Sequence, residues 1–103
     1  MPTATDVFAL MATRYVPDKL RGDRSYYFSI GDVKRTVRLT PTTCVVEEGR
    51  TVDAADCVVK ADPKLFIDMV MHGKAPGALD IARGKLKTND PGKLAELKDL
   101  FRF

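Results

Sequence analysis

Two Asp-Pro pairs, at residues 62–63 and 90–91, mark where the hydrophobic pattern of this 103-residue chain changes its period. Aspartate is a favoured helix N-cap and proline is well tolerated at the first helical position, so each pair predicts the start of a helix. Apolar residues recur at helical spacing after both pairs, within 65–70 and 94–101. The residues before the first pair instead have the pattern of strands. The chain must therefore combine a sheet with helices grouped mainly after it.

Strands are predicted from runs rich in β-branched and aromatic residues between turn residues. The segments "SYYFSI" and "KRTVRLT" flank Gly31-Asp32-Val33, which is a hairpin signal, and Gly49 supplies the next turn. Residues 51–56 are ambiguous. The strands expected on this basis cover 25–30, 34–40, 42–48, 56–61 and 85–88, and the last of them must insert beside earlier strands.

Helix signals complete the predicted order of elements. A capping-box pattern at residues 3–6 opens a helix from about Thr5 to Val16, which Pro17 stops. The helix after the first Asp-Pro pair ends at a glycine, and a short helix over 78–82 ends at another. One domain over residues 1–103 is expected from this length. The fold class is α+β, with a mixed, mostly antiparallel sheet of about five strands covered by helices.

The run Gly84-Lys85-Leu86-Lys87-Thr88 has some of the residues of a phosphate loop but not their spacing. That motif needs a glycine five residues before the Gly-Lys pair, where Leu79 stands, and a hydroxyl residue directly after it, where Leu86 stands. A phosphate loop also leads from a strand into a helix, whereas this run leads out of one. We therefore interpret Gly84 as a helix terminator.

No catalytic or metal-binding constellation is found. His72 is the only histidine, and its place at the end of a predicted helix suits the helix dipole. Ser25, Ser29, Cys44 and Cys57 are candidate nucleophiles for it, yet none lies in a recognisable signature. An enzyme that uses His72 is the weakest reading, and no metal or other cofactor is predicted. Both cysteines are expected to be reduced, although a disulfide between neighbouring strands stays open.

Charge patterning gives little support for a nucleic-acid partner. The net charge is +3, and basic residues are interleaved with acidic ones. Tyr26 and Phe28 share a strand face that could stack bases, but packing is the commoner role of strand aromatics. The longest apolar run, residues 7–12, is too short to span a membrane. A cytoplasmic location with at most transient membrane contact is expected.

The stretch from residue 55 to residue 90 resembles the sterol carrier protein 2 (SCP2) family of lipid-binding domains. Its parts read "CVVKAD", "PKLFIDMVMHGK", "APGALDIA" and "RGKLK", and "GKLAELKDLF" follows as the closing helix. The upstream helix and hairpin agree with the family in order only. One departure is "TNDP" at 88–91, where the family usually has a small or apolar residue, a glycine and an acidic or amide residue.

The resemblance implies a non-catalytic domain with an apolar tunnel between sheet and helices. The ligand would be a small lipid: a sterol-like molecule, a fatty acid or a fatty acyl-CoA. Lys85 and Lys87 are candidates for its head group. The alternative is a protein-interaction or dimerisation module, including a homodimer, that uses the same groove. The residues expected to line the tunnel are Phe28, Leu39, Val59, Phe66, Met69, Val70, Ile81, Leu86, Leu97, Leu100 and Phe101.

Overall fold

A computed structural model of the chain describes residues 3–73 and 82–101. Its elements are, in order, α1 (Ala4–Arg14), β1 (Arg24–Ile30), β2 (Val33–Leu39), β3 (Cys44–Glu48), β4 (Cys57–Ala61), α2 (Pro63–His72), β5 (Leu86–Thr88) and α4 (Pro91–Phe101). Every strand predicted from the sequence is present, and the ambiguous residues 51–56 form a loop. The short helix predicted over 78–82 falls largely outside the described residues.

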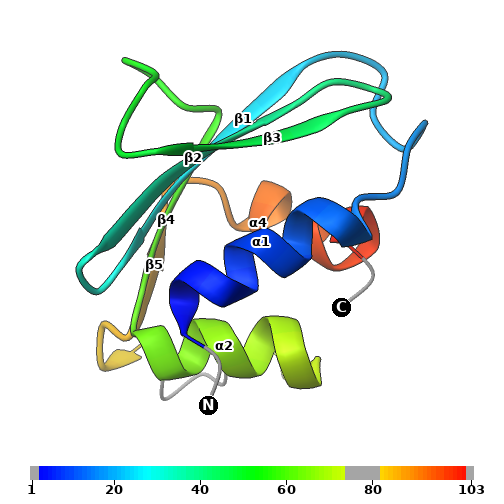
Figure 1. Ribbon diagram of the computed structural model, residues 1–103. Coiled ribbons are helices and arrows are strands. Elements are labelled where there is room, and N and C mark those ends of the chain that lie inside the picture. The colour runs from blue at the N-terminus through cyan, green and yellow to red at the C-terminus, as the bar shows by residue number, and fades with distance from the viewer. Residues whose placement is uncertain (1–2, 74–81, 102–103) are drawn as a thin grey trace.

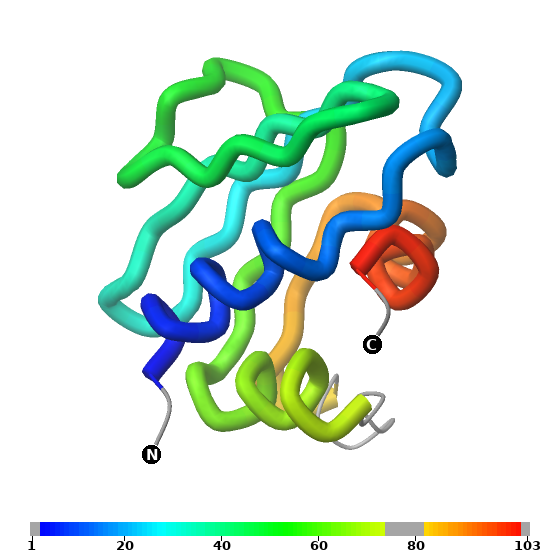
Figure 2. Tube along the Cα trace, turned by 45° about the vertical axis from the view of Figure 1, so that its right-hand side comes forward, coloured from blue at the N-terminus to red at the C-terminus, as the bar shows by residue number. Residues whose placement is uncertain are grey.

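The five strands form one mixed sheet in the order β3-β2-β1-β4-β5. Neighbouring strands are antiparallel except β1 and β4, which are parallel. The described helices α1, α2 and α4 all lie on one face of this sheet, as the two views show (Figures 1 and 2). These features confirm the predicted α+β class and the mostly antiparallel sheet. The strand β5 lies beside the earlier strand β4, as predicted, and forms one edge of the sheet.

The sheet order also answers the question about the cysteines. Cys44 lies on β3 and Cys57 on β4, and these strands are separated by β2 and β1. Both thiols are free. A disulfide between neighbouring strands is therefore excluded, because these two strands are not neighbours.

The helix starts are capped as the sequence predicted. The Thr3 hydroxyl accepts a hydrogen bond from the Asp6 amide at 3.2 Å, and the Asp6 carboxylate accepts one from the Thr3 amide at 2.9 Å. These bonds hold the pKa of Asp6 below its usual value. Asp62 caps α2 by accepting from the Lys64 amide, and Gly73 closes it in the left-handed conformation, with φ of 64°. The reciprocal bonds at α1 are a complete capping box.

The β1–β2 hairpin turn packs against the start of α2. Gly31 has φ of 58°, a value that side-chain-bearing residues rarely adopt. A Cβ at this position would lie only 2.8 Å from Cγ of Pro63. Glycine is therefore required here both by the turn and by the close approach of α2.

The face of the sheet that is turned away from the helices is called the outer face below. Thr36 on this face is fully buried, and its hydroxyl is satisfied there by donating to the Gly49 carbonyl at 2.8 Å and accepting from the Thr51 amide at 3.0 Å. The Arg50 guanidinium lies 5.2 Å from the centre of the Tyr27 ring. The segment after β3 therefore covers the middle of the outer face and leaves other parts of it open.

Candidate functional site

The candidate site is the apolar layer, defined here as the buried side chains between the sheet and α1, α2 and α4. Ten of the eleven residues predicted to line a tunnel lie in it, and Ile81 lies outside the described residues. The sheet contributes four of them and the two C-terminal helices six. They are Phe28, Leu39, Val59 and Leu86 from the strands, Phe66, Met69 and Val70 from α2, and Leu97, Leu100 and Phe101 from α4.

The centre of the apolar layer is filled by three phenylalanine rings from three different elements. The Phe28 ring on β1 lies 5.4 Å from that of Phe8 on α1 and 5.6 Å from that of Phe66 on α2. The Phe8 and Phe66 rings are 5.0 Å apart. These centroid distances are those of favourable aromatic pairs. This part of the interior is therefore packed core rather than open space.

The prediction omitted the buried face of α1. Val7, Phe8 and Met11 are each at most 1% exposed, and α1 crosses the layer between α2 and α4 (Figure 2). Their helical spacing was visible in the sequence and served to predict the helix. The spacing alone does not tell that this face lies opposite α2 and α4, which follow it by more than 45 residues.

Met69 differs from the other predicted residues by its position at the rim of the layer. The other nine described residues are at most 3% exposed and belong to the continuous core cluster. Met69 is 9% exposed and is not part of that cluster. The thioether side chain is flexible and adapts to irregular surfaces. A side chain of this kind at the rim can move without disrupting the packed rings.

The last helix, α4, is held by polar contacts as well as by its buried face. The Tyr26 hydroxyl donates to the Lys93 carbonyl at 3.0 Å, and the Val16 amide donates to the Leu100 carbonyl at 2.8 Å. Arg24 pairs with Glu96 on the same helix. These bonds fix α4 to β1 and to the end of α1.

The "TNDP" departure at 88–91 has a clear structural role. The Asn89 side-chain oxygen accepts from the Val58 amide at 2.8 Å and so satisfies a backbone donor of β4. The Asp90 carboxylate accepts from the Lys93 amide at 3.0 Å, and the Lys93 ammonium lies 2.8 Å from it. The hydrogen bonds from Lys93 hold the pKa of Asp90 below its usual value. These residues therefore build an ordinary capped entry into α4.

Tyr26 makes the stability of this arrangement dependent on pH in the alkaline range. Burial raises its pKa from 10.0 to about 12, and the hydrogen bond from Arg24 only partly opposes this. Between these values the folded chain holds a proton that the unfolded chain has lost, so stability falls as pH rises. We expect a loss of about 2–3 kcal/mol in unfolding free energy across this range, measured by urea unfolding.

The Tyr26→Phe variant is the control for this prediction, because it removes the titrating hydroxyl and keeps the ring. Burial also raises the pKa of Cys44, to about 11, and that of Cys57. A shallower loss should therefore persist in the variant. An identical pH dependence in both proteins would contradict the assignment to Tyr26.

The groups considered for catalysis are engaged elsewhere or exposed. Ser25 bonds to Asp56, Ser29 accepts from Lys34, and the Cys57 thiol lies 3.3 Å from the Thr88 hydroxyl. His72 is exposed in the last turn of α2. Raised pKa values leave the thiols protonated and weakly nucleophilic near neutral pH. Within residues 3–73 and 82–101, no three His, Cys, Asp or Glu side chains are grouped to hold a metal ion.

Two further expectations concern partners. Tyr26 and Phe28 are fully buried beneath the helices, so this pair is not open for base stacking.

Lys87 points to the outer face, since it is the register partner of Lys60, and the sheet lies between its side chain and the apolar layer. Its role at the head group of a ligand stays a prediction. In the part of the chain that the structure describes, no helix is long and apolar enough to cross a membrane.

Several known structures are similar to the structure of this chain. The sec-alkylsulfatase Pisa1 from Pseudomonas sp. is 28% identical, with a TM-score of 0.68 over 91% of this chain and 15% of the enzyme. A double mutant of that enzyme gives a TM-score of 0.70 and 27% identity, over 94% and 16%. The chain thus spans only about 15% of the length of this enzyme. No protein-family model and no curated protein matches the sequence.

Among the other similar structures are two that match over nearly their whole length. Palmitated SCP2L2 from Aedes aegypti is 13% identical, with a TM-score of 0.64 over 99% of this chain and 96% of that one. Sterol carrier protein 2 from Yarrowia lipolytica, in its apo form, is 17% identical, with a TM-score of 0.60 over 97% and 93%. The fold is therefore that of the sterol carrier protein 2 domains. The chain is an SCP2-like domain, as the resemblance of its C-terminal half predicted.

Proposed function

We propose that this domain binds one small lipid by burying its acyl or ring portion within the apolar layer. The observation that carries the proposal is the convergence of apolar side chains from four strands and two helices onto one layer. The match to an SCP2 domain named as palmitated, along 99% of this chain, supports a ligand of this class. The domain acts in this proposal as a carrier or holder, without catalysis.

The binding energy would come from removing apolar surface from water. Each buried methylene group contributes about 0.8 kcal/mol, so an acyl chain of a dozen such groups gains about 10 kcal/mol in total. Part of this offsets the lost freedom of the ligand and the movement of rim side chains. Because the ring cluster is already packed, the ligand would enter at the rim near Met69 rather than replace the three phenylalanines.

Several finer points are included in the proposal. The ligand is a fatty acid, a fatty acyl-CoA or a sterol-like molecule, and transfer between membranes is a task consistent with reversible binding. Fatty acids lead this set, because one of the matching SCP2 domains is named as palmitated. A cytoplasmic location and a homodimer stay predictions.

A second function is favoured by the similarity to Pisa1. The identity of 27–28% is higher than to either SCP2 protein, and the matching region is a small part of that enzyme. The chain would then act as a non-catalytic domain beside an enzyme, and its apolar layer would hold the alkyl part of an amphiphilic substrate. Binding of a secondary alkyl sulfate as tightly as palmitate would favour this function.

The test is native mass spectrometry of the purified chain, before and after addition of palmitate. We expect one lipid per chain, identified by organic extraction, or uptake of one palmitate by the empty protein. Size-exclusion chromatography across protein concentrations distinguishes lipid binding from the alternative, in which the chain is a protein-interaction or dimerisation module. A folded chain that takes up no palmitate, acyl-CoA, sterol or alkyl sulfate, and that forms a tight dimer, would contradict the proposal.

A further inference from the structure

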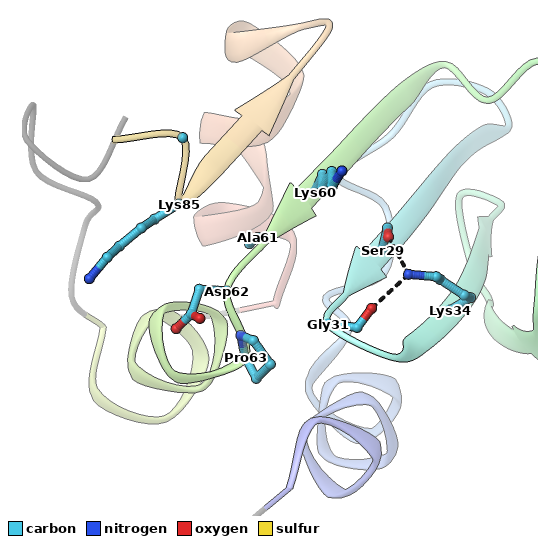
Figure 3. Close-up of a pocket in the computed structure, with 9 residues that line it drawn as sticks. Ser29, Gly31, Lys34, Lys60, Ala61, Asp62, Pro63 and Lys85 are labelled. Carbon is cyan, nitrogen blue, oxygen red and sulfur yellow. Dashed lines mark hydrogen bonds between the residues drawn. The ribbon is translucent and has the colours of Figure 1, made fainter. Parts of the chain in front are cut away.

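A pocket of about 320 Å³ lies at the edge of the apolar layer, where β1 and β4 end, and shares the wall residue Ala61 with that layer. Its walls include Ser29, Lys34 and Lys60 from the strands and Asp62 and Pro63 from the start of α2, as Figure 3 shows. The volume is at the lower end of those found for small-molecule sites. The pocket forms because the parallel strands diverge after Ile30 and Ala61, one into the hairpin turn and the other into α2.

Three lysines and a serine form one row across the outer face at this pocket. Ser29 is the register partner of Lys34 on β2 and of Lys60 on β4. Lys60 is in turn the partner of Lys87 on β5. Directly paired residues point to the same face of a sheet. The order across the four strands is therefore Lys34, Ser29, Lys60, Lys87.

The first two members of the row are already oriented as donors. The Lys34 ammonium donates to the Ser29 hydroxyl oxygen at 2.7 Å and to the Gly31 carbonyl at 2.6 Å, drawn as dashed lines in Figure 3. An ammonium has three N–H groups, so one of them is left for a ligand. Since the Ser29 oxygen accepts from Lys34, its O–H is left to donate as well.

The positive charge of the row is not neutralised by the protein. Lys60 and Lys87 stand directly opposite each other, an arrangement that is destabilising for like charges. Among the described residues, none of Lys34, Lys60 and Lys87 forms an ion pair with a carboxylate. The one acidic residue in the pocket wall, Asp62, accepts from the Lys64 amide as the N-cap of α2. An anion in the pocket would meet more positive than negative charge.

A fourth lysine in the wall provides a contrast. The side chain of Lys85 extends away from Lys34 and Lys60, on the far side of Asp62 (Figure 3). It carries the same charge and belongs to the same wall, but it does not take part in the row. Lys85 is therefore a matched control for any effect of general positive charge.

We propose that this lysine pocket, made by Ser29, Lys34 and Lys60 with Lys87 beside them, binds a phosphate-type oxyanion. The ligand chemistry is a phosphate group on a small molecule or on a lipid head group. Ammonium and hydroxyl donors give short, charge-assisted hydrogen bonds to such oxygens. Because the donors of the row lie on the outer face, the proposal does not rest on lipid binding in the apolar layer.

The first experiment follows backbone amide NMR signals during titration with inorganic phosphate, with sodium chloride at matched ionic strength as the reference. We expect saturable shifts at Ser29, Gly31 and Lys60. The Lys60→Gln variant should bind phosphate about tenfold more weakly, since one hydrogen bond to a charged group is lost. The Lys85→Gln variant should stay within about twofold, because it loses only distant, screened charge. Absence of saturable shifts, or equal weakening in both variants, would overturn the proposal.

The second experiment separates the two sources of phosphate. Vesicles of phosphatidylcholine with phosphatidic acid, and vesicles of phosphatidylcholine alone, are sedimented with each protein. Sedimentation only with phosphatidic acid, lost in Lys60→Gln and kept in Lys85→Gln, would assign a lipid head group. Phosphate binding in the NMR titration without sedimentation would assign a soluble phosphate compound. Sedimentation that is the same for both variants would overturn a role of the pocket at membranes.

Discussion

Replacement of Phe28 by alanine is expected to lower the free energy of unfolding by about 3–5 kcal/mol, the usual cost of removing a fully buried phenylalanine. Its ring contacts those of Phe8 on α1 and Phe66 on α2, and it is fully buried. The substitution leaves a cavity that rigid neighbours only partly fill. A domain of ordinary stability has about 5–15 kcal/mol in total, so this loss is a large share.

The neighbouring residue supplies a control for the Phe28 prediction. Tyr27 is an aromatic residue of the same strand on the opposite face, where its ring meets the Arg50 guanidinium. The Tyr27→Ala variant should lose only about 1 kcal/mol, the range of an exposed cation–π pair. Urea unfolding measures both variants, and comparable slopes make their midpoints comparable. Similar losses for Phe28→Ala and Tyr27→Ala would contradict the central role of the ring cluster.

The elements could be predicted from the sequence because their signals are local. Two helix starts are predicted by Asp62-Pro63 and Asp90-Pro91, and one helix end is predicted by Gly73. Each of these signals acts within four residues, through one cap or one backbone conformation. The hairpin around Gly31 is equally local, and the structure pairs its strands as the turn required.

The order of strands could not be predicted in the same way. The parallel pair of β1 and β4 joins residues about 31 positions apart, such as Tyr26 and Cys57. The edge position of β5 depends on its pairing with β4 after α2 has intervened. Such pairings are decided by packing of whole elements and leave no signature in a short window. The sequence therefore predicted that the last strand lies beside earlier strands, but not that its partner is β4 or that it forms an edge.

The two candidate sites also differ in how far they could be predicted from the sequence. The apolar layer was largely predictable, since helical and strand periodicity identify buried faces such as Phe66–Val70. The lysine pocket was not, because Lys60 becomes a neighbour of Ser29 only through the parallel pairing of β1 and β4, although Lys34 already pairs with Ser29 within the local hairpin. In the sequence they are scattered among acids and have the appearance of a solvated surface.

Replacement of Met69 by glutamate is expected to abolish uptake of an uncharged apolar fluorescent probe. An unpaired carboxylate beside a bound acyl chain costs several kcal/mol to desolvate, which corresponds to weakening by about a hundredfold or more. Because Met69 lies at the rim and outside the continuous core cluster, the variant should still fold. Probe binding by fluorescence titration gives the effect, and circular dichroism with urea unfolding verifies the fold.

Two further variants make the Met69 result specific. Met69→Leu conserves volume and apolar character, so its probe affinity should remain close to normal. Lys85→Ala removes a charge from the pocket wall and should also leave probe uptake nearly unchanged. Loss of uptake in Met69→Glu alone would place the ligand against this face of α2, since the phenylalanine cluster beneath it is intact in all three proteins. Normal uptake by a folded Met69→Glu variant would remove α2 from the site and leave α4 as the wall to examine.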